Sequence, residues 1–263
     1  MIPGAGIGGP GGGNPFPPPN PGAGIGGKPI ITPPVNPGIP NPVNPGIPGN
    51  GGVLGAADRV AVGLNLKQLF ISFQSQAAIS NDTFPSVYSP QGKKFSWRVA
   101  ILPQLEGGQA VLNQLKLNEA WDSPHNLMVA KTAMPKVFAP VGRSAGQGET
   151  FIKTFTGMDT IFSGISGNFY LYDSKTAPIK STIRKGLVNT VLFVDSATPV
   201  IWTKPEEIEY NPKMDLATVL NFAGGKASIV LADGSVKTIT PDKAKEELHK
   251  AINQNAQGNP NLD

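Results

Sequence analysis

Two glycine motifs near the start of this sequence have the spacing of a dinucleotide-binding turn. Gly-x-Gly-x-x-Gly occurs at 4–9 and again at 22–27. Such a turn binds pyrophosphate only where it joins a buried strand to the N-terminus of a helix. Both copies lie among prolines, which remove backbone donors and interrupt regular structure. We therefore expect no nucleotide cofactor.

A second catalytic pattern, Gly-x-Ser-x-Gly, occurs as Gly-Arg-Ser-Ala-Gly at 142–146. A nucleophile elbow needs a strand before the serine and a helix after it. Here Pro140 precedes the motif and a predicted strand follows it. The chain has only two histidines that could serve as the general base. These features favour a surface loop over a hydrolase site.

The two histidines, His125 and His249, are both predicted to lie on helices. His249 is near the predicted end of the last helix, where an imidazolium interacts favourably with the helix dipole. No His, Asp or Glu pair has ligand spacing on one predicted face. We therefore expect structural histidines, no metal site and no catalytic residues.

One dense acidic cluster is formed by Glu206, Glu207 and Glu209. The run Thr203-Lys-Pro-Glu has the pattern of a capping box that opens a short helix. Binding of a divalent cation is the alternative interpretation. The capping box is the simpler explanation of these residues.

The three tryptophans, Trp97, Trp121 and Trp202, each lie beside a polar residue. An indole can bury its ring and still place its N–H at a polar edge. This favours tryptophans that anchor the core, with a ligand-stacking platform as the alternative.

Composition excludes several classes of protein. The chain has no cysteine, which rules out disulfides, cysteine zinc sites and thiol catalysis. Its net charge is +4, and Lys93–Lys94 and Arg184–Lys185 are isolated basic pairs. A nucleic-acid surface needs clustered basic residues, so we expect no nucleic-acid partner.

The first part of the chain, residues 1–52, is rich in Gly, Pro and Asn and contains internal repeats. The segment 3–9 recurs at 21–27, and 34–40 recurs at 42–48. This composition predicts a disordered low-complexity arm. Residues 53–263 have the composition of one folded domain. No apolar run approaches the roughly 18 residues of a membrane span, and no export signal is recognisable in the sequence given.

Helical patterns dominate the first half of the predicted domain. Apolar residues recur at three- and four-residue steps from Leu54 to about Ser80, which predicts one long amphipathic helix. Its predicted buried face comprises Leu54, Val60, Leu64, Leu69, Phe70, Phe73 and Ala77. Shorter helices are predicted from Ser96 with a bend at Pro103, around 110–115, and from Ser123 to Ala133, where Ser123 caps and Pro124 opens the helix.

Strand patterns follow in the second half. Predicted strands cover 137–139, 151–156, 169–172 and 190–194. Residues 228–239 predict a hairpin with a two-residue type I′ turn at Asp233-Gly234. Thr240 and Pro241 then open a closing helix that reaches Ile252. Helices followed by strands predict an α+β fold.

Several strings of residues resemble a planctomycete pseudopilin-like family. They are Asn65–Gln68, Phe84–Pro85, Ser96–Pro103, Trp121–Asn126 and Ala232–Val236. The family has a prepilin-type cleavage and methylation N-terminus, a C-terminal His-(nine residues)-Asp-Gly motif and a domain of unknown function that is also labelled as solute-binding. The residues that match its motifs are Trp97, Arg98, Pro103, Trp121, Asp122, Pro124, His125, Asn189, Asp233 and Gly234.

The resemblance implies a type IV pilin-like fold, in which a long N-terminal helix packs on an antiparallel sheet. It implies a structural role for the matching residues and a place in the cell envelope or outside the cell. The sequence departs from the family where the Gly/Pro-rich arm replaces the apolar leader helix. It also has Ala223 at the position of the motif histidine.

We therefore expect a non-enzymatic structural or interaction protein of the bacterial envelope, without a cofactor. Its expected partners are other envelope proteins or further copies of the chain. The alternative is an extracellular module that binds a solute or a glycan. A binding module requires a concave pocket lined by a tryptophan, whereas an interaction protein requires an exposed apolar patch.

Overall fold

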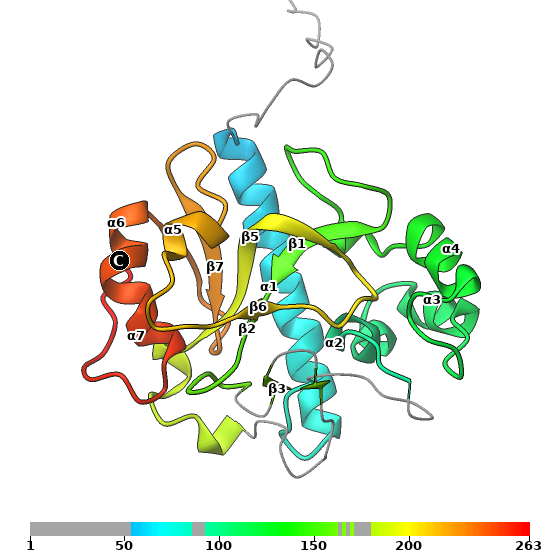
Figure 1. Ribbon diagram of the computed structural model, residues 1–263, viewed down its shortest axis with the longest axis horizontal. Helices are drawn as coiled ribbons and strands as arrows, with labels where there is room; N and C mark the ends of the chain where they lie inside the picture. The colour runs from blue at the N-terminus through cyan, green and yellow to red at the C-terminus, as the bar shows by residue number, and fades with distance from the viewer. Residues whose placement is uncertain (1–53, 86–92, 163–164, 167–168, 171–179) are drawn as a thin grey trace, which may run out of the picture. The chain divides into compact units, whose positions relative to one another are not determined.

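The computed structural model describes residues 54–85, 93–162, 165–166, 169–170 and 180–263 (Figure 1). These residues belong to one compact unit, Ile47–Asp263. The predicted arm at 1–52, with its repeats and both glycine motifs, lies outside the described residues. So do the last two residues of the strand predicted at 169–172.

One long helix is followed first by short helices and then mainly by strands, and short helices end the order of elements. The α-helices are α1 (Ala56–Ile79), α2 (Trp97–Ala100), α3 (Gly108–Gln114), α4 (Pro124–Thr132), α5 (Leu216–Val219), α6 (Pro241–Lys243) and α7 (His249–Ile252). The 3₁₀ segments are η2 (Leu102–Gln104), η3 (Lys136–Phe138), η4 (Lys180–Thr182) and η5 (Leu187–Asn189), and η6 (Ala244–Leu248) is a π-helix. The strands are β1 (Glu149–Lys153), β2 (Phe155–Thr156), β3 (Ile165–Ser166), β4 (Phe169–Tyr170), β5 (Val191–Ile201), β6 (Ile208–Glu209), β7 (Ala227–Leu231) and β8 (Val236–Ile239).

The main sheet has four antiparallel strands in the order β1-β5-β7-β8. Strands β2 and β6 form a separate parallel pair, and β3 and β4 form an antiparallel pair. Helices together with an antiparallel sheet confirm the predicted α+β class.

Helices cover both faces of the main sheet. Helix α1 crosses one face and contacts β5, β7 and β8 (Figure 1). The core on this side is centred on Phe73, whose ring contacts four other aromatic rings. The segment α6-η6-α7 covers the opposite face, where Leu248 and Ile252 belong to the same buried apolar cluster as Ile229. The sheet is therefore a central layer with an apolar core on each side.

Helix α1 is apolar on two faces, which the sequence pattern did not predict. The face against the sheet comprises Val62, Leu66, Leu69, Phe73 and Ala77. The prediction that Val60 and Leu64 belong to the buried face is wrong, because they are 63% and 66% exposed. Positions 60 and 64 fit a helical period as well as 62 and 66 do, so periodicity alone does not select the buried face.

Several predicted strands differ from those observed. The prediction of a strand at 137–139 is wrong, because η3 occupies these residues. The strand predicted at 151–156 is interrupted at Thr154, where the chain leaves β1 and enters β2. The strand predicted at 190–194 continues as β5 to Ile201. Between Asp195 and Val200, which pair with β1, β5 has four residues opposite a single residue of β1, a β-bulge larger than the usual two residues opposite one.

The turn between β7 and β8 is a three-residue loop, so the predicted two-residue type I′ turn is wrong. Leu231 N–H donates to the carbonyl of Ser235, and Gly234 N–H donates to the carbonyl of Leu231. Gly234 has φ +87°, whereas Asp233 has no positive φ. The Asp233 carboxylate accepts hydrogen bonds from the N–H and hydroxyl of Ser235. A type I turn followed by a left-handed glycine is the usual three-residue hairpin loop.

Candidate functional site

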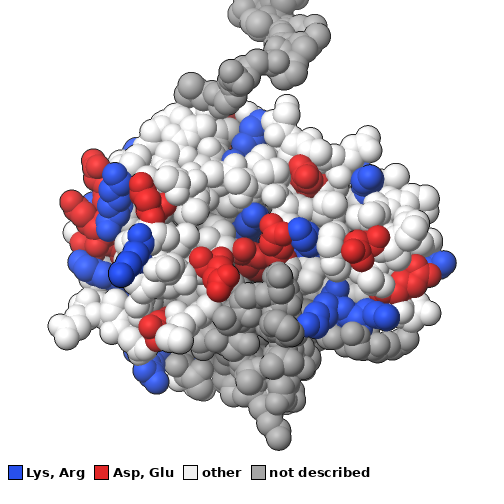
Figure 2. All heavy atoms as spheres, in the orientation of Figure 1, with Lys and Arg blue, Asp and Glu red and all other residues white. Residues whose placement is uncertain are grey.

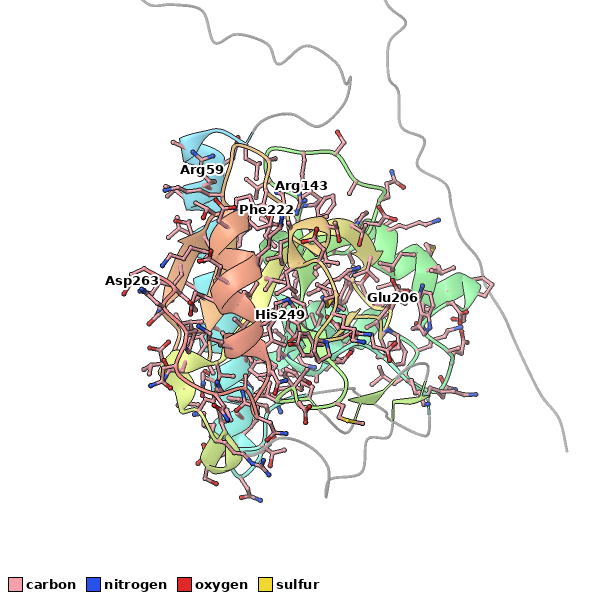
Figure 3. All side chains as sticks on the ribbon, turned by 60° about the vertical axis from the view of Figure 1, so that its left-hand side comes forward. Arg59, Arg143, Glu206, Phe222, His249 and Asp263 are labelled. Atoms are coloured by element: carbon pink, nitrogen blue, oxygen red, sulfur yellow. The ribbon has the colours of Figure 1, made fainter. Side chains whose placement is uncertain are left out.

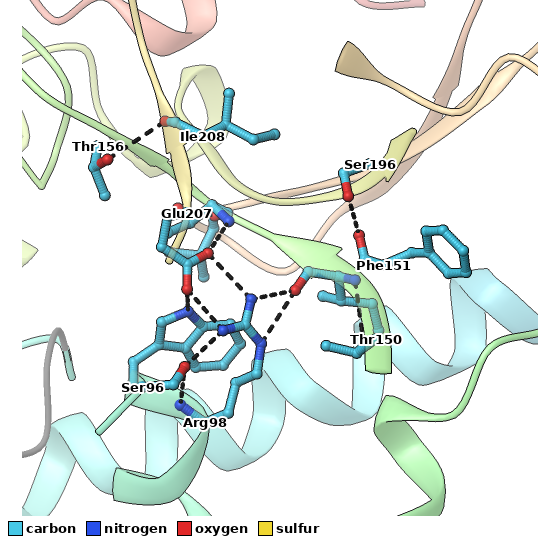
Figure 4. Close-up of polar contacts among 12 residues, drawn as sticks. Ser96, Arg98, Thr150, Phe151, Thr156, Ser196, Glu207 and Ile208 are labelled. Carbon is cyan, nitrogen blue, oxygen red and sulfur yellow. Dashed lines mark hydrogen bonds and ion pairs between the residues drawn. The ribbon is translucent and has the colours of Figure 1, made fainter. Parts of the chain in front are cut away.

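Arg98, one of the family-motif residues, is a fully buried arginine at the edge of the main sheet (Figure 4). Ser96 caps the short helix α2 by accepting from Arg98 N–H, and this places the arginine side chain beside β1. The guanidinium donates to the Ser96 hydroxyl at 2.6 Å and to the Ile152 carbonyl from two of its nitrogens. It also lies 4.7 Å from the Trp97 ring centre.

The partner of this arginine is Glu207, 109 residues away in the sequence. Its carboxylate binds the guanidinium in a bidentate manner, at 2.7 and 3.1 Å. It also accepts from the indole N–H of Trp97 and from the backbone N–H of Thr154, both at 2.9 Å. Glu207 lies in an extended segment, so the helix predicted from the capping box at Thr203 is wrong. The carboxylate is occupied by an ion pair.

Together, Arg98 and Glu207 occupy the position of a further strand beside β1. A neighbouring parallel strand would donate to one carbonyl and accept from the N–H two residues later. The guanidinium donates to Ile152 O and the carboxylate accepts from Thr154 N–H, which is the same pair of groups. Backbone pairing then resumes where Ile208 N–H donates to Thr154 O. The ion pair therefore caps the β1 edge.

The Arg98–Glu207 ion pair has no capacity left for a substrate. All five N–H groups of the guanidinium can be assigned to Ser96, Ile152 and Glu207. Each carboxylate oxygen of Glu207 accepts two hydrogen bonds. A group that acts as a base, nucleophile or ligand needs an available lone pair. All hydrogen-bonding groups of this ion pair are therefore used within the protein itself.

A second ion pair joins the loop after η3 to the β5 bulge. Arg143 pairs with Asp195 and donates to the Ser196 carbonyl at 2.8 Å. The other Asp195 oxygen accepts from the Asn221 amide at 2.9 Å. Burial lowers the pKa of Arg143 to about 10, which the charge of Asp195 opposes. The Gly-x-Ser-x-Gly motif is thus a loop, and its Ser144 is exposed.

A narrow cleft beside this ion pair is lined by residues including Asn65, Pro140, Arg143, Phe151 and Asp195. Its volume is about 10 Å³, which is close to the room that a single water molecule needs. The cleft does not have the size of a pocket for a sugar or a metabolite, which requires hundreds of Å³.

The motif residues from Trp121 to His125 stabilise the start of α4. The Ser123 hydroxyl accepts from Asn126 N–H, and Pro124 is the first helical residue. His125 Nε2 lies 2.8 Å from the Gln114 carbonyl, and Asp122 is exposed. Asn126 was not predicted as a site residue, yet it is fully buried and its side chain bonds the backbone of Lys116 and Ala120. A polar residue on a helix face expected to be buried could have indicated such a role.

The tryptophans divide between the core and the surface. Trp202 is fully buried, and its indole N–H donates to the Ala130 carbonyl at 3.0 Å. Trp97 stacks on Phe193 at 4.6 Å. Trp121 is half-buried, with the Lys204 ammonium 5.7 Å from its ring centre. Only Trp121 therefore presents part of its ring to solvent.

The remaining motif residues lie in turns. Pro103 is in η2, where it follows the bend at the end of α2. Asn189 is in η5, and its amide donates to the Lys185 carbonyl at 3.1 Å. Asp233 and Gly234 form the hairpin loop, against which α1 docks. Lys67 of α1 donates to the Gly234 carbonyl at 2.8 Å.

His249 lies on the C-terminal helical segment (Figure 3). Its Nδ1 is 3.0 Å from the Tyr210 hydroxyl. Burial lowers the pKa of His249 below its usual 6.5, although the Met214 backbone and Asp215 oppose this shift. The predicted stabilisation of an imidazolium by the helix dipole is therefore not the dominant effect, and the neutral ring is favoured.

The lowered pKa of His249 predicts a loss of stability in acid. The unfolded chain binds the proton at a higher pH than the folded chain does. The stability is therefore fully present above the pKa of the unfolded chain, and it falls as the pH drops through the pKa of the folded chain. We expect the urea midpoint to fall between about pH 7.5 and pH 5. The His249→Gln variant should lose part of this dependence. An identical pH profile for the two proteins would contradict the assignment.

Helix α1 has four large apolar side chains that are exposed to solvent. Val60, Leu64, Ile71 and Ile79 are 63%, 66%, 56% and 71% exposed. They lie opposite the buried face, along roughly 28 Å of helix at 1.5 Å per residue. Exposed Gln68 and Ser75 lie between these apolar residues on the same side of the helix. Apolar side chains that share one side of a helix indicate an interaction surface more than ones scattered over the protein do. We call these four residues the α1 stripe.

Most of the chain matches one known protein family. Residues 59–245 match SBP_bac_10, described as a protein of unknown function (DUF1559), and this range covers more than two thirds of the sequence. The chain belongs to this family. No curated protein and no solved structure matches it.

The DUF1559 match begins in α1 and ends in η6, so it includes both ion pairs, the main sheet and the whole α1 stripe. Across the described part of this DUF1559 chain, no helix is both long and apolar enough to cross a membrane. The same residues contain no group of three or more Asp, Glu or His that could hold a metal ion. On the face in Figure 2, basic and acidic side chains are interspersed.

Proposed function

We propose that this DUF1559 chain is a non-enzymatic structural or interaction protein of the bacterial cell envelope, with a pseudopilin-like domain. The α1 stripe is the observation that carries the proposal. A helix buries one apolar face against its own sheet, and a second apolar face requires another partner to leave water. The stripe fits a contact with an envelope protein or with another copy of the chain.

The pilin-like arrangement is supported by the packing of α1. A 24-residue helix crosses an antiparallel sheet and docks on the loop of its last hairpin. The resemblance of the Ser96–Pro103 and Trp121–Asn126 strings to pseudopilin-like proteins points the same way. An export route and an envelope location follow from this resemblance.

A non-enzymatic role is supported by the state of the buried charged groups. Arg98 and Glu207 use their hydrogen-bonding capacity on each other and on the backbone. Asp195 is held by Arg143 and Asn221. Catalytic groups, in contrast, converge on a cavity that admits a substrate. We infer that these ion pairs stabilise the fold.

Photo-crosslinking in the native bacterium tests this proposal. A benzoylphenylalanine residue placed at Leu64 or Ile71 should form a discrete adduct that is recovered with the envelope. The matched control carries the same residue at Gln109, which is exposed on α3 outside the stripe. The proposal fails if the protein fractionates with the cytosol, or if the stripe positions crosslink no more than position 109 does.

Binding of a solute or glycan is the second candidate function, and one observation favours it. Trp121 is half-buried and has Lys204 over its ring, with Glu206 paired to the same lysine. An exposed indole face beside polar groups can stack on a sugar. A change in tryptophan fluorescence on addition of an envelope glycan, lost in Trp121→Ala, would support this function over the first.

A further inference from the structure

Strand β8 is the outer strand on the side of the main sheet opposite β1. It pairs with β7 through Val230–Val236, Ile229–Lys237, Ser228–Thr238 and Ala227–Ile239. Among the described residues, no other strand pairs with β8. Asp263, which pairs with Lys237 of β8, lies on one side of the molecule in Figure 3. Glu206, the neighbour in sequence of Glu207 at the β1 edge, lies on the opposite side.

The hydrogen-bond pattern shows which groups of β8 point outward. Leu231 N–H donates to Ser235 O, which makes these residues a hydrogen-bonded pair. Antiparallel pairs alternate, so Val236 and Thr238 belong to pairs that direct their N–H and C=O groups away from β7. Within the described chain, no hydrogen bond reaches these outward groups. Each residue therefore presents one donor and one acceptor at the edge.

The charge on β8 is already neutralised. Lysine on an edge strand ordinarily opposes the addition of another strand. Here the Lys237 ammonium pairs with the Asp263 carboxylate, and their side chains are 33% and 84% exposed. In a contact between two copies, each Lys237 therefore brings its own carboxylate counter-charge. The paired side chains add no net charge to the edge.

We propose that β8 pairs antiparallel with β8 of a second copy of this chain. The two-fold axis passes through Lys237, so Val236 of one copy exchanges both hydrogen bonds with Thr238 of the other. The result is one continuous sheet with four strands from each copy. A two-fold axis requires a surface that matches itself, and the outward residues lie symmetrically about Lys237. This contact is independent of the α1 stripe.

A single cysteine tests the pairing, because the chain has no cysteine of its own. In the proposed register the two copies of residue 237 face each other with Cα atoms about 4.5 Å apart, within disulfide range. The full-length Lys237→Cys variant should form a disulfide-linked dimer under mild oxidation. Lys213→Cys, at an exposed lysine outside β8, is the matched control. Equal crosslinking of the two variants would overturn the proposal.

A second variant tests the backbone groups directly. Thr238→Pro removes an N–H that faces away from β7, so the hairpin ladder keeps all its hydrogen bonds. Sedimentation should show a concentration-dependent dimer for the natural chain and for Thr238→Val, and a monomer for Thr238→Pro with unchanged circular dichroism. A dimer that persists in Thr238→Pro would exclude β8 pairing. Changes in the α1 stripe should leave this dimer intact, which separates the test from that of the proposed function.

Discussion

Replacing Glu207 with alanine should lower the free energy of unfolding by about 3–5 kcal/mol, the usual cost of leaving a buried charge without its partner. The guanidinium of Arg98 is fully buried and would lose its only carboxylate. Trp97 N–H and Thr154 N–H would lose their acceptor at the same time. Urea unfolding monitored by tryptophan fluorescence measures the change.

Two controls separate the buried ion pair from a general loss of charge. Glu206→Ala removes a neighbouring carboxylate that is 44% exposed and paired with Lys204, and it should change stability by less than about 1 kcal/mol. The double variant Arg98→Met with Glu207→Leu should be more stable than Glu207→Ala alone, because it leaves no charge in the core. Equal effects of Glu207→Ala and Glu206→Ala would show that the buried Arg98–Glu207 ion pair does not stabilise the fold.

Replacing Gly234 with alanine should destabilise the chain by about 2–5 kcal/mol, from backbone strain and overpacking together. The residue has φ +87°, and a Cβ atom there would lie 2.3 Å from Cε1 of Phe70. To relieve this contact, α1 would have to move away from the hairpin loop to which Lys67 is bonded.

Gly225 provides a matched control for Gly234. It has φ +83°, but a Cβ atom there would meet nothing within 4 Å. Gly225→Ala should therefore cost only the backbone strain of about 1–2 kcal/mol. Thermal unfolding of the two variants measures the difference, which is the contribution of the Phe70 contact. Equal losses would show that α1 does not press on the loop.

Local chemistry explains why the ends of several helices could be predicted. Ser123 and Thr240 each accept the hydrogen bond expected of an N-cap, and a proline follows each as the first helical residue. These signals involve residues close in sequence, so they survive in any tertiary setting. The long helix observed at Ala56–Ile79 lies within two residues of the predicted bounds at each end.

Contacts between distant residues explain what could not be predicted. Arg98 meets Glu207 across 109 residues, and no local pattern specifies such a pair. A signal was present, because an arginine within the apolar run from Trp97 to Leu102 must either reach solvent or find a buried partner. The sequence pattern at Thr203 favoured a capping box, whereas the burial of Glu207 beside β1 decided the observed structure.

The same kind of ambiguity affected α1 and the hairpin. Val60 and Leu64 fit a helical period, but a helix with apolar residues on two faces has no unique buried face until its sheet is placed. Asp233-Gly234 suits either a two-residue or a three-residue turn. The hydrogen bonds from Ser235 to the Asp233 carboxylate select the longer loop.

The capped edge at β1 limits how far an assembly can extend. Two chains joined through β8 would each present their β1 side outward, and there the carbonyl of Ile152 and the N–H of Thr154 are already satisfied by side chains. An incoming strand cannot pair with these two groups, which disfavours growth of a cross-β fibre from that side. Arg98 and Glu207 therefore limit the addition of further strands at the β1 edge.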